Sequence, residues 1–170
     1  MIQSLLRLLL LSVLATGCSQ KYYIVRHAEK AQASDGITMQ TKNDPPLSDA
    51  GKRRADELKL KLAGAGIGQV FSTNTLRTVQ TATPFAESRG LTIQHYGKTD
   101  SAFFAQLKSL KKNTLIVGHS NTVDDLVNGL TGRVQFTDLP DAAYDNLFIV
   151  KKKGKRLTFF REKFGQPSAE

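Results

Sequence analysis

Residues Lys21–Lys30 have the sequence KYYIVRHAEK, and the end of this stretch guides the interpretation of the whole chain. The apolar residues 23–25 predict a buried strand, and Arg26 and His27 follow at the point where that strand should end. A strand held in a core is a rigid support for the side chains at its end. The fold should therefore show which other residues share the space around Arg26 and His27.

The order of the remaining segments predicts the fold class. QVFST, LTIQHY and NTLIVGH predict further strands, with helices between them, the first capped by Ser48 and running to about Ala63. We expect Pro84 to end or restart the second helix, Gly132 to stop the last one, and the final GQPSAE to be frayed. NLFIV and RLTFF flank KKKGK and predict a hairpin. The pattern predicts an α/β protein, a three-layer α/β/α sandwich whose mostly parallel sheet ends in a C-terminal antiparallel hairpin.

Polar residues follow three of the predicted strands. Arg26 and His27 follow the first, Arg77 lies shortly after the second, and His119 follows the LIV strand. The carboxyl ends of parallel strands meet at one edge of a sheet, so these side chains should lie together. The third histidine, His95, lies inside a predicted strand, where a structural role is the simpler expectation.

Two histidines and two arginines in one place suit phosphoryl transfer. The planar guanidinium of arginine matches phosphate oxygens, and a neutral imidazole can attack phosphorus and carry the phosphoryl group. Beyond alignment and stabilisation of charge, this reaction needs little from a protein. Each residue alone has a plainer explanation, since Arg77 could pair with a surface carboxylate and His119 could cap a helix.

Four blocks are spread over about Tyr22 to Leu130, namely YYIVRHAEK, NDPPLSDAGKRRA, FSTNTLRTVQTA and LIVGHSNTV. Together they resemble the histidine phosphatase superfamily, also called phosphoglycerate mutase-like. The resemblance implies that His27 is the phosphorylated nucleophile and that Arg26, Arg77 and His119 form the phosphate pocket. It implies no metal and no other cofactor. The expected function is a metal-independent phosphatase that hydrolyses phosphate monoesters or phosphohistidine through a covalent phosphohistidine.

Two other classes of function stay open at this point. One is a catalytically inactive relative that binds phosphorylated ligands, and the other is a metal-dependent hydrolase built on the two histidines and nearby acids. The spacing of those groups resembles no compact ligand motif, and arginines beside a cation would repel it. Little room is available for a long insertion between Tyr96 and Asn113, so hydrolysis is expected rather than mutase activity.

The sequence does not identify a proton donor for the leaving group. Asp100 follows the third predicted strand, but it could equally cap the helix that begins near Ser101. The other candidates are Glu29, Glu87 and Asp124, and an activated leaving group would need none of them.

The first 17 residues, MIQSLLRLLLLSVLATG, predict a secretory signal peptide, since the apolar run is too short to span a bilayer comfortably. Cys18 is the only cysteine and cannot form an internal disulfide. LATGC resembles a bacterial lipobox, which implies lipid attachment at Cys18. We therefore expect an exported, membrane-anchored lipoprotein of the bacterial cell envelope, with residues 1–17 as signal peptide and 18–170 as a single domain.

The formal net charge is +9 over 170 residues, but the basic residues are dispersed along the chain. Their densest cluster, Lys151–Arg156, falls in the predicted hairpin turn, with no interleaved aromatic pattern. We therefore expect a small phosphorylated substrate and no nucleic acid as partner, with the charge serving solubility and the attraction of anions. The oligomeric state cannot be predicted from these features.

Overall fold

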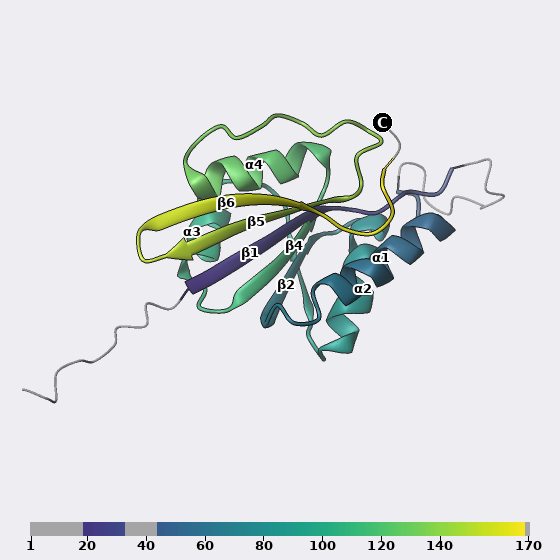
Figure 1. The fold of residues 1–170 in the computed structure, drawn as a ribbon, viewed down its shortest axis with the longest axis horizontal. Coiled ribbons are helices and arrows are strands. Elements are labelled where there is room, and N and C mark those ends of the chain that lie inside the picture. Colours follow the sequence, from purple (N-terminus) through teal and green to yellow (C-terminus); the bar gives the residue numbers. More distant parts are fainter. Residues whose placement is uncertain (1–18, 33–43, 169–170) are drawn as a thin grey trace, which may run out of the picture.

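The computed structural model describes residues 19–32 and 44–168, and the strands in these ranges form one sheet in the order β3-β2-β4-β1-β5-β6 (Figure 1). β1 to β4 run parallel to one another, β5 runs antiparallel to β1, and β6 runs antiparallel to β5. The strands are β1 (Ser19–Arg26), β2 (Ile67–Thr73), β3 (Ile93–Tyr96), β4 (Asn113–Gly118), β5 (Asn146–Lys153) and β6 (Arg156–Lys163). The predicted mostly parallel sheet with a C-terminal hairpin is confirmed.

Helices cover both faces of this sheet, which gives the predicted three layers (Figure 1). They are α1 (Asp49–Lys61), α2 (Leu76–Ser88), α3 (Ser101–Ser109) and α4 (Ser120–Thr131). Successive side chains of β1 alternate between the two layers of core, because side chains of a strand point to opposite faces. Tyr22 and Ile24 pack with residues of α3 and α4, whereas Tyr23 and Val25 pack with residues of α1 and α2.

Short polar contacts fix the helix ends that flank the strands. Ser48 Oγ accepts a hydrogen bond from the backbone N–H of Gly51 at 3.1 Å and so caps α1, as expected. The Asp100 carboxylate accepts from the N–H of Phe103 at 3.0 Å and caps α3. Gly132 ends α4 with a φ of 68°, a left-handed conformation that favours glycine.

The expectation for Pro84 was wrong, because α2 continues through it to Ser88. Proline within a helix removes one backbone donor and costs about 3 kcal/mol. Phe85 and Ala86, on the far side of the proline, are buried against the sheet. Their burial outweighs the missing hydrogen bond and keeps the last turn helical.

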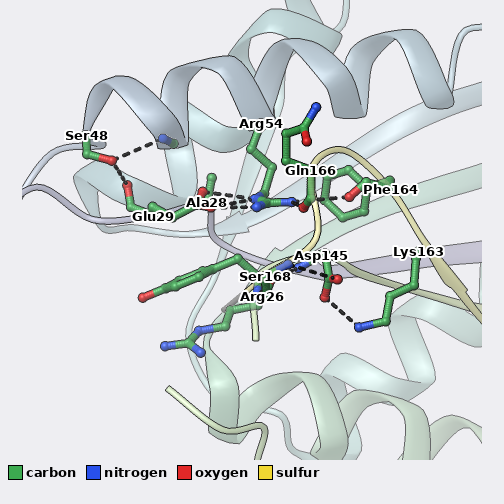
Figure 2. A network of polar contacts seen from close by, with 12 residues as sticks. Arg26, Ala28, Glu29, Ser48, Arg54, Asp145, Lys163, Phe164, Gln166 and Ser168 are labelled. Carbon is green, nitrogen blue, oxygen red and sulfur yellow. Dashed lines mark hydrogen bonds and ion pairs between the residues drawn. The ribbon is translucent and has the colours of Figure 1, made fainter. Parts of the chain in front are cut away.

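The expectation of a frayed end was also wrong for the described residues, which extend to position 168. The carbonyl of Gln166 accepts a hydrogen bond from Arg54 at 2.9 Å. Ser168 Oγ accepts from the backbone N–H groups of Tyr144 and Asp145, at 2.8 and 2.9 Å. The tail is therefore fixed by partners far away in the sequence (Figure 2).

The predicted signal peptide and Cys18 lie outside the described residues. Within the described ranges, none of the helices combines the length and the hydropathy required to cross a bilayer.

Candidate active site

The two histidines expected at the sheet edge lie side by side. His27 directly follows β1 and His119 directly follows β4, the parallel neighbour in which Gly118 pairs with Arg26. The N–H of His27 donates to the carbonyl of Gly118 at 2.8 Å. The imidazole rings meet edge to face, with their centroids 5.3 Å apart. The parallel pairing of β1 with β4 thus brings together residues that are 92 positions apart in the chain.

His27 is held in one tautomer. Its Nδ1 lies 2.7 Å from the backbone oxygen of Ala28, and since a carbonyl can only accept, Nδ1 carries the hydrogen. Burial, followed by the positive charges of Arg26 and Arg77, lowers the pKa of His27 to about 3. The imidazole is therefore neutral near pH 7 and keeps a lone pair on Nε2.

His119 has similar electrostatics in a different setting. It occupies the N-cap position of α4, and its two ring nitrogens lie 3.4 Å from the hydroxyls of Thr73 and Thr75. Burial, with smaller contributions from the positive charges of Arg77 and Arg26, lowers the pKa of His119 to about 4. A phosphate dianion beside the ring would oppose this lowering, because an opposite charge favours the protonated form.

The two arginines flank the histidines and leave donors unused. Arg26 donates to the backbone oxygens of Pro140 and Asp141, at 2.8 and 3.0 Å. Arg77, in the first turn of α2, pairs with Asp44 at 3.2 Å. The Nε–H groups of both arginines are buried without a hydrogen-bond partner among the described residues. Buried guanidinium donors without partners are costly unless an anion completes them.

Two residues of this region were missed by the sequence analysis. Both carboxylate oxygens of Asp44 accept from the backbone N–H of Leu76, each at 3.0 Å, and one of them also accepts from Arg77. It thereby caps α2, whose own N-cap residue makes no side-chain cap. Its position in the NDPP block was the available signal. Tyr144 has its ring 4.5 Å from the Arg26 guanidinium and 6.0 Å from the His27 ring, with no signal in the sequence.

The structure gives each candidate proton donor a definite place. The Glu29 carboxylate accepts hydrogen bonds from Arg54 at 2.6 to 2.9 Å, and Asp100 caps α3. Glu87 is exposed in the last turn of α2, roughly 15 Å along the helix from Arg77. Asp124 is buried within α4, and burial raises its pKa. None of these four groups contacts the histidine pair among the described interactions.

The described ranges contain no cluster of three or more His, Cys, Asp or Glu side chains arranged to hold a metal ion. His95, the remaining histidine, is exposed on β3.

Comparisons with known proteins concern the sequence pattern and the fold. The model of the histidine phosphatase superfamily (branch 1) matches residues 22–98. No curated protein sequence matches the chain.

Solved structures with low sequence identity share the fold. The protein histidine phosphatase SixA in complex with tungstate is 19% identical with a TM-score of 0.67, and the alignment covers 85% of this chain and 97% of that one. A mycobacterial glucosyl-3-phosphoglycerate phosphatase is 13% identical with a TM-score of 0.59, and the alignment covers 85% of this chain and 98% of that one. An Escherichia coli protein, provisionally assigned as an α-ribazole-5′-phosphate phosphatase, is 16% identical with a TM-score of 0.65, covering 85% and 96%.

At identities this low, the structural similarity shows that the fold is shared and does not identify a substrate. The family match ends at residue 98, before the second histidine at 119, which the structure places against the first. Residues 22–98 thus carry the sequence pattern of the histidine phosphatase superfamily, branch 1, and the chain has the histidine phosphatase fold.

Proposed function

We propose that the protein is a metal-independent phosphatase that works through a covalent phosphohistidine on His27. One observation carries the proposal. A neutral, tautomer-fixed His27 lies beside His119, between two arginines whose buried Nε–H groups have no partner among the described residues. This arrangement supplies a nucleophile and unused donors for anionic oxygens in the same place.

The reaction would proceed in two displacements. Nε2 of His27 attacks phosphorus as the bond to the leaving oxygen breaks, and the electron pair of that bond departs with the oxygen. Donors on Arg26, Arg77 and His119 stabilise the charge on the three remaining phosphoryl oxygens. Water then attacks phosphohistidine, the P–N bond breaks, and inorganic phosphate leaves with neutral His27 restored. No described carboxylate is assigned as donor to the leaving oxygen.

The substrate class proposed is a phosphate monoester or a phosphohistidine. Both are consistent with the comparisons, which include a protein histidine phosphatase and phosphatases named for small molecules. A leaving group that is already activated needs no proton donor, which agrees with the absence of a free acid beside the histidines in the described ranges.

Hydrolysis of p-nitrophenyl phosphate by the full chain in EDTA tests the proposal. The His27→Ala variant should lose activity, whereas His95→Ala should keep it, because His95 is exposed on β3 away from the pair. Equal activity in His27→Ala and the unmodified chain would refute the assignment of the nucleophile. Activity that is present without EDTA and lost when EDTA is added would indicate a metal-dependent hydrolase. An inactive chain that still binds phosphate would be the ligand-binding relative.

We also propose that the protein is an exported lipoprotein with a lipid on Cys18, since the signal-like leader and LATGC precede the first strand directly. Mass spectrometry of the protein from its native cells should find an acylated N-terminal Cys18. A chain that still begins at Met1 without modification would exclude the anchor.

A further inference from the structure

Basic residues that are dispersed in the sequence gather at one end of the fold. Three segments meet there, namely the link from α3 to β4, the residues after α4, and the turn between β5 and β6. They contain no Asp or Glu between residues 108–113, 131–137 and 151–158. We define the basic pole as Lys108, Lys111, Lys112, Arg133, Lys152, Lys153, Lys155 and Arg156.

A hydrogen bond, a shared groove and a strand pairing join these segments. The ammonium of Lys152 donates to the carbonyl of Lys108 at 2.7 Å. Arg133, Lys155 and Arg156 line one groove of about 580 Å³. The hairpin turn also lies beside the start of β1, because Ser19 pairs with Lys153 (Figure 1). The pole is therefore one continuous surface, which the spacing of its residues in the sequence does not show.

The charges of the pole are not neutralised within the described part of the chain, where none of its residues takes part in an ion pair. Between Arg133 and Gln135, both of which line the groove, the side chain of Val134 is 83% exposed. An exposed apolar side chain among unpaired cations is the composition of surfaces that bind at a membrane interface.

The position of the chain's N-terminal segment identifies the occupant. The first strand begins at Ser19, so one peptide bond joins the described fold to Cys18, and the apolar run precedes Cys18 by a few residues in the sequence. Ser19 and Arg26 stand at opposite ends of β1, roughly 23 Å apart. A membrane at the Ser19 end would therefore meet the basic pole and leave the histidine pair on the far side.

We propose that the basic pole binds the anionic headgroups of a membrane surface and orients the histidine site away from it. The inference does not depend on phosphatase activity, because it concerns the other end of the sheet. Each lysine or arginine near an anionic bilayer strengthens binding about fivefold, and this gain falls off within a Debye length.

Flotation of the full chain with lipid vesicles tests the proposal. The quantity measured is the ratio of partition into vesicles with phosphatidylglycerol to partition into vesicles of phosphatidylcholine alone. The apolar N-terminal segment favours both vesicles alike, so the ratio isolates the electrostatic part. The triple variant Lys153→Glu, Lys155→Glu and Arg156→Glu should lower the ratio at least about 100-fold, since the loss of three basic residues alone accounts for that factor.

The matched control carries the same change of charge at the other end of the strands, Lys30→Glu, Arg53→Glu and Lys98→Glu, all at exposed positions without an ion pair in the described ranges. It should lower the ratio far less than the pole variant. Thermal unfolding confirms that both variants fold, and p-nitrophenyl phosphate hydrolysis of the pole variant should be unchanged.

Equal loss of the ratio in both variants would overturn the proposal, because net charge alone would then explain the binding. So would a ratio near one in the unmodified chain, or binding of duplex DNA at the pole without any preference for phosphatidylglycerol. Absence of phosphatase activity in every chain would refute the proposed function and leave this inference untouched.

Discussion

Arg54 offers the sharpest test of what holds the candidate site together. It lies on α1 with its side chain 5% exposed, and its guanidinium forms an ion pair at 2.6 Å with the carboxylate of Glu29, two residues after His27. It also donates to the carbonyls of Phe164 and Gln166, at 3.2 and 2.9 Å (Figure 2). One guanidinium thus joins the segment after β1, the first helix and the C-terminal tail.

Replacing Arg54 with methionine would keep the apolar stem and remove every one of these donors. Loss of one partner from a buried ion pair costs roughly 3–5 kcal/mol, because the other charge stays buried without compensation. The Glu29 side chain is 23% exposed, so water reaches part of the carboxylate and reduces this penalty. We expect Arg54→Met to lower the free energy of unfolding by about 3 kcal/mol.

Urea denaturation of the full chain measures this difference, with Arg53→Met as the control. Arg53 neighbours Arg54 on α1 but is exposed, so its replacement should change the free energy of unfolding by less than about 0.5 kcal/mol. The double variant Arg54→Met with Glu29→Gln should recover part of the loss, since no buried charge is left alone. A loss in Arg54→Met no larger than in Arg53→Met would refute this account of the network.

Three further predictions concern backbone space, protonation and anion binding. Gly51→Ala should destabilise the chain by about 1–3 kcal/mol, because the Cβ of the new alanine would overlap the carbonyl oxygen of Glu29. Gly64→Ala is the control and should be tolerated, because a Cβ there meets open space; equal midpoints of thermal unfolding for the two variants would contradict the prediction. The pKa of His27 is about 3 in the folded chain and near 6.5 in the unfolded chain, so between these pH values only the unfolded chain binds this proton, and stability should fall as pH falls through that window. The variant His27→Asn should flatten this dependence of the unfolding free energy on pH, and an unchanged slope would exclude a buried neutral His27. Inorganic phosphate at about 100 times its dissociation constant should stabilise the chain by about 2.7 kcal/mol, and Arg77→Met should reduce this gain at the same phosphate concentration; an equal gain in both chains would place the anion elsewhere.

The strands and the meeting of the histidines could be predicted because they depend on local patterns and one topological rule. The apolar run before Arg26 and the run before His119 are both short, continuous and followed by polar residues. Such runs predict buried parallel strands, and parallel strands place their carboxyl ends at one edge. The structure confirms that the two rings lie in contact.

Features that depend on contacts between distant segments could not be predicted in this way. Arg54 meets Gln166 across 112 positions, and no local pattern distinguishes it from exposed Arg53 beside it. For the same reason the tail appeared frayed although Ser168 is bound to the segment before β5. The basic pole also depends on where α3, α4 and the hairpin end in space, which the dispersed lysines of the sequence do not reveal.

Trapping the covalent intermediate tests the central claim most directly. The full chain is mixed with a substrate labelled in its phosphoryl group, quenched in alkali within milliseconds and digested, and the labelled peptide is sequenced. The account predicts acid-labile, alkali-stable label on the peptide that contains His27, and none in the His27→Ala variant. Label on any other side chain, or hydrolysis that proceeds with no labelled histidine, would contradict it.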